Sequence, residues 1–253
     1  MIPKTVLITG ANTGFGKAIA VNLSKYNYNL ILSGRSLEKL EPVMAEIKSV
    51  SQSKIYSLIM DVRNFEACEK EIHAIPTPFQ KIDVLVNNAG LALEMNTIEQ
   101  GDLEDWNTMI DTNVKGILHV TRLVAPQMVE RKEGHIINIG SISSHEIYKG
   151  GNVYCATKHA VWALTKGMRS DFLEHNVRVT QVSPGAAETE FSNTRFHGDK
   201  ARAAKVYEGF IALSAKDVAD VVEFAITRPP HVCLDEIIMT PSAQFNGIIV
   251  RDS

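Results

Sequence analysis

The amino-acid sequence predicts an α/β fold in which helices cover both faces of a doubly wound parallel sheet of about seven strands. Short apolar runs alternate with helical patterns along the chain, and parallel neighbouring strands require such helical crossovers. A glycine-rich turn directly follows the first apolar run. The chain has 253 residues, of which 45% are apolar, enough to bury one large core. We therefore expect one domain over residues 1–253.

The elements follow one another in a regular alternation. Strands are expected near Thr5–Thr9, Asn29–Ser33, Lys54–Met60, Asp83–Asn87, His135–Ile139, Arg178–Val182 and Glu236–Met239. Helical patterns fill the gaps, and the two long segments Leu103–Arg131 and Asn152–Glu174 are expected to flank the functional site. Only Ile75–Gln80, with its two prolines, and the region Pro184–Asp199 are expected to be irregular, and neither resembles an interdomain linker.

The first strand, turn and helix are typical of a nucleotide-binding segment. Glycines at positions 10, 14 and 16 allow a tight turn and a close approach of the backbone to a pyrophosphate. The free N–H groups at the start of the following helix favour negative charge. The spacing is G-x-x-x-G-x-G rather than the common G-x-G-x-x-G, so an ordinary strand–helix connection remains an alternative for the glycines alone.

Tyr154 and Lys158 have the spacing of an acid catalyst and its tuning group. On a helix, residues i and i+4 share a face, so the ammonium of Lys158 is expected near the phenol of Tyr154. A free phenol has a pKa of about 10, and a fixed neighbouring cation is expected to lower it toward neutral pH. By itself, the pair also fits an exposed helical contact. Ser141 lies thirteen residues upstream, just after an apolar run.

Charge and cysteine content exclude several classes of function. A net charge of −3 provides no basic field for nucleic acid. Three separated cysteines and eight unclustered histidines indicate neither a disulfide framework nor a metal site. The chain enters its first strand without signal-peptide features, and no apolar run approaches about 18 residues. We therefore expect a cytoplasmic protein without a membrane or nucleic-acid partner.

The motifs together resemble the short-chain dehydrogenase/reductase family over nearly the whole chain. They are Thr9-Gly10-x-x-x-Gly14-x-Gly16, Asn87-Asn88-Ala89-Gly90, Asn113, Ser141, Tyr154 with Lys158, and Pro184-Gly185. Asn12, Thr13 and Phe15 depart from the small and aliphatic residues often found in the first turn, but no catalytic group is missing. The resemblance implies a single-domain Rossmann fold and an oxidoreductase that transfers hydride with a nicotinamide cofactor.

The resemblance also implies the roles of individual residues. Tyr154 exchanges the hydroxyl proton, Ser141 binds the same oxygen, Lys158 also reaches the nicotinamide ribose, and Asn113 holds a water that links Lys158 to solvent. The residues expected to bind the cofactor are Thr9, Gly10, Asn12, Thr13, Gly14, Phe15, Gly16, Arg35, Ser36, Asp61, Val62, Asn88, Ala89, Gly90, Tyr154, Lys158, Pro184, Gly185, Ala187 and Thr189.

The end of the second strand predicts NADP(H) as the cofactor. NAD recognition uses an Asp or Glu about 20 residues after the glycine turn, to accept from the ribose 2′-hydroxyl. Gly34 occupies that place here, and Arg35 and Ser36 follow it. A guanidinium can bind a 2′-phosphate bidentately. The alternative is that Arg35 is a solvated residue at a helix start.

Five stretches, 87–93, 106–113, 134–141, 150–158 and 189–196, are more closely similar to one group of the family. This group is the NADP-dependent 3-hydroxy acid dehydrogenases, also called serine or allo-threonine dehydrogenases. That resemblance implies a small anionic substrate, for which we expect Arg195, Tyr148 and Gln244 to act together with Ser141 and Tyr154. Residues 184–212 are expected to cover the substrate, and 240–253 form a C-terminal tail. For each of these three added residues, a surface or packing role is the alternative.

Other functions stay open. A carboxylate and a sulfonate both suit a guanidinium with neutral donors, so an NADPH-dependent sulfoacetaldehyde reductase that forms isethionate is the first alternative. A non-catalytic NADPH-sensing regulator is the second, although the chain keeps every catalytic group. The family resemblance also implies a homo-oligomer, a tetramer or else a dimer. Trp106, Met109, Trp162 and Met168 are candidates for its interface or for the core.

Overall fold

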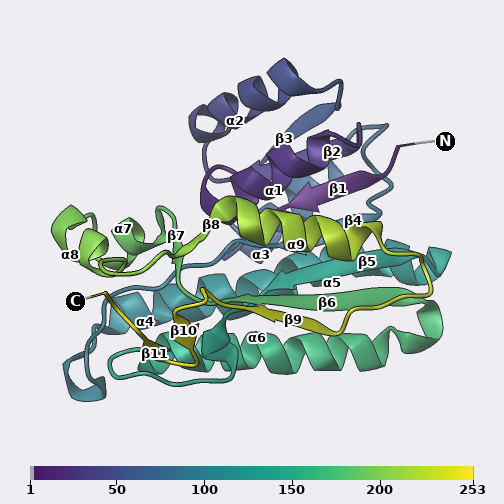
Figure 1. The fold of residues 1–253 in the computed structure, drawn as a ribbon. Coiled ribbons are helices and arrows are strands. Elements are labelled where there is room, and N and C mark those ends of the chain that lie inside the picture. The colour runs from purple at the N-terminus through teal and green to yellow at the C-terminus, as the bar shows by residue number, and fades with distance from the viewer. Residues whose placement is uncertain (1–2, 253) are drawn as a thin grey trace.

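Seven parallel strands form the central sheet in the computed structural model of the protein, which describes residues 3–252. Their order is β3-β2-β1-β4-β5-β6-β9 (Figure 1). The strands are β1 Thr5–Ile8, β2 Asn29–Gly34, β3 Ile55–Ile59, β4 Val84–Asn87, β5 Gly134–Ile139, β6 Val177–Pro184 and β9 Glu236–Met239. This confirms the predicted doubly wound fold, and every strand lies where the apolar runs placed it, with ends shifted by no more than two residues.

Helices cover both faces of the sheet and enclose two apolar layers. On one face lie α1 Gly14–Ser24, α2 Leu37–Val50 and α9 Ala215–Thr227, and on the other α3 Phe65–His73, α5 Gly116–Arg131 and α6 Asn152–Asp171. Figure 1 shows α1 and α9 side by side, and α6 below β6 and β9. Ile19 and Leu23, one turn apart on α1, are fully buried, as their spacing predicts. Among residues 3–252, no helix is long and apolar enough to cross a membrane.

The long segment Leu103–Arg131 contains a break that the sequence pattern does not reveal. It consists of α4 Leu103–Ile110, a π-helical turn over Asp111–Lys115, and α5. π-helical turns often occur at functional sites. Here the turn carries Asn113, whose buried side chain bonds to the loop after β4.

The region Pro184–Asp199, expected to be irregular, contains two short elements. Strand β7 (Ala187–Glu188) pairs with β8 (Leu213–Ser214), and helix α7 (Phe191–Arg195) follows β7. The prediction was wrong here because the pairing partner of β7 lies 26 residues away along the chain. A further helix, α8, spans Lys200–Lys205, and the tail forms a hairpin of β10 (Gln244–Phe245) and β11 (Ile248–Ile249). Ile75–Gln80 is irregular, as predicted.

The four aromatic and methionine residues considered for an interface separate into two groups. Met109 and Met168 are buried in the core, and Trp106 packs half-buried against the cluster around Met109. Trp162 on α6 remains 37% exposed. Only Trp162 is therefore left as a surface candidate.

Gly16 allows α1 to start against the end of β1. A Cβ atom at this position would lie 2.3 Å from the carbonyl oxygen of Gly10 and 2.5 Å from the amide nitrogen of Asn88. Gly16→Ala should therefore destabilise the protein by about 2–3 kcal/mol, and thermal unfolding should show it. Gly167, inside α6, is the matched control because nothing would lie within 4 Å of its Cβ. Gly167→Ala should stabilise by roughly 0.5–1 kcal/mol, and equal effects at both sites would contradict the packing argument.

Candidate active site

A cavity of about 900 Å³ lies where the loops after the parallel strands meet. Strand order reverses on either side of β1, the place where ligands bind in open α/β sheets. The sequence-predicted residues that line it are Gly10, Asn12, Thr13, Gly14, Phe15, Arg35, Asp61, Val62, Asn88, Ala89, Gly90, Ser141, Tyr148, Tyr154, Lys158, Pro184, Gly185, Ala187, Thr189, Arg195 and Gln244. The structure thus brings together segments that are far apart along the chain.

Four of the predicted residues do not line the cavity but lie behind or beside the residues that do. The Thr9 hydroxyl accepts from the backbone N–H groups of Asn88 and Ala89, at 3.0 Å each, and so joins the ends of β1 and β4. Gly16 has the packing role described above. Ser36 is the residue before α2, and its side chain caps no N–H group of the helix. The fourth, Asn113, lies behind the cavity and bonds to Leu91 and Thr157.

The glycine turn is shaped to receive an anion. Gly10 and Gly14 have φ angles of +63° and +53°, in the left-handed region that favours glycine. Thr189 lies next to Gly14, so the loop after β6 closes over this turn. Helix α1 has no acidic residue in its first turn, and its N-terminal N–H groups remain available for negative charge.

Three cationic side chains line the cavity beyond the end of β2. Arg35 was predicted; Lys39 and Arg63 were not. Arg63 donates to Asp61 in a bidentate ion pair, with its Nη2 at 2.7 Å from Oδ2. Burial raises the pKa of Asp61, but the hydrogen bonds and charge of Arg63, with help from Arg35, bring it below its usual value. The sequence did contain a signal for Lys39. It lies three residues after Ser36, in the first turn of α2, so its side chain can reach the same part of the cavity as Arg35.

Tyr154 and Lys158 lie on α6 with their side chains buried, 8% and 6% exposed. The Lys158 ammonium donates to the carbonyl oxygen of Ile139 at 2.9 Å and lies 5.9 Å from the centre of the Tyr154 ring. Ser141 follows β5, and its hydroxyl oxygen accepts from the backbone N–H of Ser143 at 3.1 Å. The three predicted catalytic side chains therefore meet at one end of the cavity.

The predicted lowering of the Tyr154 pKa by Lys158 was wrong for this arrangement. Burial raises the pKa of Tyr154, and it outweighs the lowering effects of the Arg195 cation and the Ser141 hydroxyl. The Lys158 ammonium is directed at a backbone carbonyl instead of the phenol. Burial also lowers the pKa of Lys158 itself, to about 8.

Asn113 is fully occupied by protein contacts. Its amide oxygen accepts from the Leu91 N–H at 2.8 Å, and its amide nitrogen donates to the Leu91 carbonyl at 2.8 Å and to the Thr157 hydroxyl at 3.0 Å. These bonds fix the loop after β4 against α6. The water link to Lys158 stays a prediction.

Arg195, on α7, lies over the ring of Tyr154. Its Nη2 donates to the Tyr148 hydroxyl at 2.8 Å, and its guanidinium carbon lies 5.2 Å from the ring centres of both Tyr154 and Phe191. The Nε atom is buried without a hydrogen-bond partner. A buried, unsatisfied charged donor is costly unless a ligand completes it, so this position suits an anion.

Gln244 lines the cavity, and its side chain is already held by two hydrogen bonds within the protein. Its amide oxygen accepts from the Ala186 N–H at 2.7 Å, and its amide nitrogen donates to the Asn246 carbonyl at 2.9 Å. A Cβ atom on Gly185 would lie 2.3 Å from that amide oxygen. Gln244 thus holds the tail against the Pro184-Gly185 turn, a role that the sequence did not indicate.

Comparison with known proteins identifies the family. Residues 4–200 match the family described as short chain dehydrogenase. The NADP-dependent 3-hydroxy acid dehydrogenase YdfG of Escherichia coli K12 is 44% identical over 248 residues, covering 97% of this chain and 98% of its own. The NADP-dependent 3-hydroxy acid dehydrogenase of Schizosaccharomyces pombe is 40% identical over 242 residues, 95% of this chain and 93% of its own.

Solved structures agree with this. The closed form of serine dehydrogenase complexed with NADP⁺ superposes with a TM-score of 0.91 at 43% identity, covering 98% of this chain and all of its own. The structure of serine dehydrogenase from Escherichia coli superposes with a TM-score of 0.83 at 38% identity, covering 95% of this chain and 99% of its own. The chain belongs to the short-chain dehydrogenase family, as its motifs predicted.

Proposed function

We propose that this short-chain dehydrogenase interconverts a small anionic 3-hydroxy acid, of the serine, allo-threonine or 3-hydroxypropionate type, and its carbonyl form with NADP(H). The observation that carries the anionic substrate is Arg195, whose buried Nε has no partner and whose guanidinium lies 5.2 Å from the Tyr154 ring. A carboxylate bound there would place the neighbouring carbon atoms over the acid–base group. The similar 3-hydroxy acid and serine dehydrogenases support the same substrate class.

The cavity fits NADP(H) at its other end. The left-handed glycines bring the backbone close enough for a pyrophosphate, and Arg35 and Lys39 provide positive charge where a 2′-phosphate would lie. Arg63 lines the same part of the cavity, but its charge is paired with Asp61. Gly34 leaves no carboxylate to repel that phosphate. When bound, the cofactor supplies or accepts the hydride.

The residues of the chain then handle the proton and the developing charge. Tyr154 donates a proton to the carbonyl oxygen in reduction and removes it from the hydroxyl in oxidation. Ser141 hydrogen-bonds the same oxygen and stabilises its partial charge. The Lys158 ammonium adds positive charge behind this pair, and Asn113 holds the loop that faces it.

Glu146 favours a substrate that also carries an amino group. It is half-buried, lines the cavity five residues after Ser141, and forms no ion pair among residues 3–252. The exposed Lys149 also lines the wall nearby. An acid in the same cavity as Arg195 disfavours a plain anion but complements a zwitterion such as serine. This supports the amino acid over the sulfonate of the sulfoacetaldehyde alternative.

A substrate panel tests the function. Serine, allo-threonine, 3-hydroxypropionate and isethionate are oxidised with NADP⁺, and malonate semialdehyde and sulfoacetaldehyde are reduced with NADPH, each followed by NADPH absorbance. We expect kcat/KM to be highest for a 3-hydroxy acid. Preference for the sulfonate pair would replace the proposal by the sulfoacetaldehyde reductase. NADPH binding with no turnover of any compound would indicate a sensor.

Cofactor preference provides a mutational prediction. The double variant Gly34→Asp, Arg35→Ser should shift the ratio of kcat/KM values toward NADH, because it supplies a ribose acceptor and removes a phosphate ligand. A Cβ at residue 34 would meet Leu40 at 3.4 Å, an ordinary contact, so the variant should fold. Wild-type enzyme that already uses NADH as well as NADPH would show that Arg35 does not have this role.

A homo-oligomer is part of the proposal. The exposed Trp162 on α6 and the exposed Ile110 and Leu118 along α4 and α5 provide apolar surface for a subunit contact, 37%, 39% and 42% exposed. Light scattering should give a mass of four or two chains, and a monomer would contradict it.

A further inference from the structure

The turn that carries Ser141 is anchored at both of its ends. At the first end, the Gly140 N–H donates to the Val182 carbonyl on β6 at 2.8 Å. A Cβ atom on Gly140 would lie 2.6 Å from the amide nitrogen of Gln181, so the turn also packs tightly on that side chain. Ser141 follows directly, and its position depends on what holds the other end.

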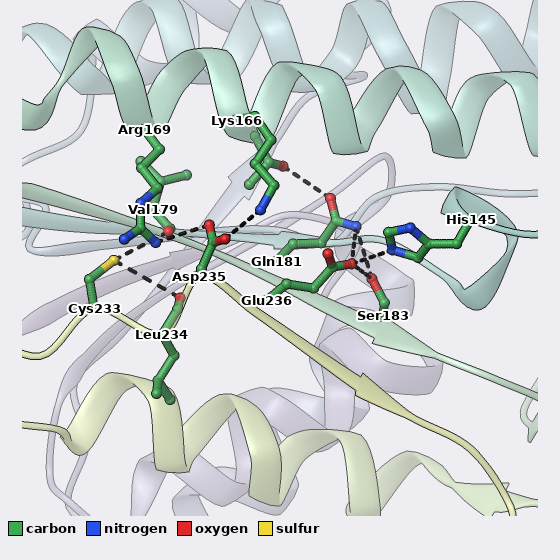
Figure 2. A network of polar contacts seen from close by, with 11 residues as sticks. His145, Lys166, Arg169, Val179, Gln181, Ser183, Cys233, Leu234, Asp235 and Glu236 are labelled. Atoms are coloured by element: carbon green, nitrogen blue, oxygen red, sulfur yellow. Dashed lines mark hydrogen bonds and ion pairs between the residues drawn. The ribbon is translucent and has the colours of Figure 1, made fainter.

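The second anchor is His145, which reaches the edge strand of the sheet. Its Nε2 lies 2.7 Å from Oε1 of Glu236, the first residue of β9. The His145 ring also meets the edge of Trp162, with ring centres 6.0 Å apart. Figure 2 shows His145 and Glu236 directed at one another, with Gln181 and Ser183 beside them.

Glu236 is itself fixed from the interior. The same Oε1 accepts from Gln181 at 2.9 Å and from Ser183 at 2.7 Å. The network continues inward, since Thr165 donates to the Gln181 amide oxygen at 3.1 Å, and Asn138 donates to Thr165 at 2.9 Å. A connected, buried polar network of this kind favours one rigid arrangement. His145 is therefore tied to the rigid centre of the sheet.

The anchored turn sets the place of the Ser141 hydroxyl. Within the turn, the Ser144 N–H donates to the Ser141 carbonyl at 2.8 Å and the Ser143 N–H to its hydroxyl at 3.1 Å. The Ser144 hydroxyl accepts a long bond from Gln181 at 3.4 Å. With these short links, a shift of His145 is passed to Ser141, and catalytic geometry tolerates only small displacements.

Resting on the function proposed above, we propose that His145 and Glu236 are positioning residues that hold Ser141 against Tyr154. Neither residue touches the cavity wall, so they act through the turn. The contact needs a donor at residue 145 and an acceptor at 236.

The neighbouring ion pair provides a matched control. Asp235 precedes Glu236 and pairs with Lys166 and Arg169 on α6, with Nη1 of Arg169 at 3.0 Å (Figure 2). It has no bond to the turn that carries Ser141. Asp235→Asn removes a charge from the same edge of the sheet without touching the turn.

The experiment compares His145→Ala, Glu236→Ala, the rescue variants His145→Gln and Glu236→Gln, and Asp235→Asn in the full chain. The Ala variants should lower kcat about five- to twentyfold with KM for NADP⁺ unchanged within about twofold. The Gln variants keep a donor or an acceptor and should stay within about threefold of wild type. Asp235→Asn should behave as wild type.

The acidity of Tyr154 provides a second readout that needs no turnover. Since the Ser141 hydroxyl lowers the pKa of Tyr154, the Ala variants should raise that pKa further. The difference in phenolate absorbance between each protein and its Tyr154→Phe counterpart measures this. Arg195, Lys158, Cys155 and Tyr207, which also surround Tyr154, are the same in all variants.

An unchanged Tyr154 titration in the Ala variants would overturn the proposal, whether or not kcat falls. A fall of kcat that Asp235→Asn shares would overturn it too, because it would indicate general loosening of the sheet edge. The titration works even where no compound of the panel is oxidised, so the proposed function and this inference can fail separately.

Discussion

Tyr154→Phe should abolish turnover while NADPH binding stays nearly intact. The substitution removes only the phenolic oxygen, and the ring keeps its contact with Phe191, at 5.8 Å between centres. General acid–base groups contribute about 10²–10⁴-fold to rate, so kcat should fall at least a hundredfold. Steady-state kinetics and fluorescence titration with NADPH measure the two effects separately.

Tyr56→Phe is the control for this substitution. Tyr56 lies on β3, packs against Phe79, and does not line the cavity. Its variant should keep full activity. Should Tyr154→Phe keep a tenth or more of the wild-type kcat, Tyr154 is not the acid–base group, because tenfold is only about 1.4 kcal/mol of barrier.

The sheet and the meeting of the candidate catalytic side chains at one place could be predicted because their signals are local. An apolar run such as Ile136-Ile137 forms a buried strand in any parallel sheet, and the i, i+4 spacing of Tyr154 and Lys158 needs only a helix. The glycine turn likewise depends on its own backbone. Such features depend little on the rest of the chain.

The errors concern properties that depend on distant segments. The pKa of Tyr154 depends on how deeply the loop after β6 and helix α7 bury it, and spacing along α6 contains no information about that. The Gln244 side chain accepts a hydrogen bond from Ala186, 58 residues away. The sequence of the C-terminal tail alone could not predict this contact. Arg63 is an exception: it pairs with Asp61, only two residues away, and was not predicted although this signal is local.

In the proposed function, the charge around Arg195 decides which substrates the enzyme accepts. Arg195 meets only the neutral Tyr148 hydroxyl and aromatic faces, so its charge is not cancelled by a carboxylate of residues 3–252. Arg202, seven residues later on α8, is bound bidentately by Glu94 and is already neutralised. Two arginines of the region 184–212, which is expected to cover the substrate, thus have opposite environments, and this makes them a matched pair for experiment.

Arg195→Ala should raise KM for every anionic substrate about ten- to a hundredfold, as expected when a charge-assisted contact of roughly 1.5–3 kcal/mol is lost. An uncharged aldehyde of the same length should be nearly unaffected. Arg195→Lys should recover only part of the loss, since an ammonium keeps the charge but not the fork. Arg202→Ala should leave the ratio between anionic and neutral substrates unchanged. Equal losses for both substrates in Arg195→Ala would indicate a disturbed lid, and no loss for either would leave the substrate class undetermined by Arg195.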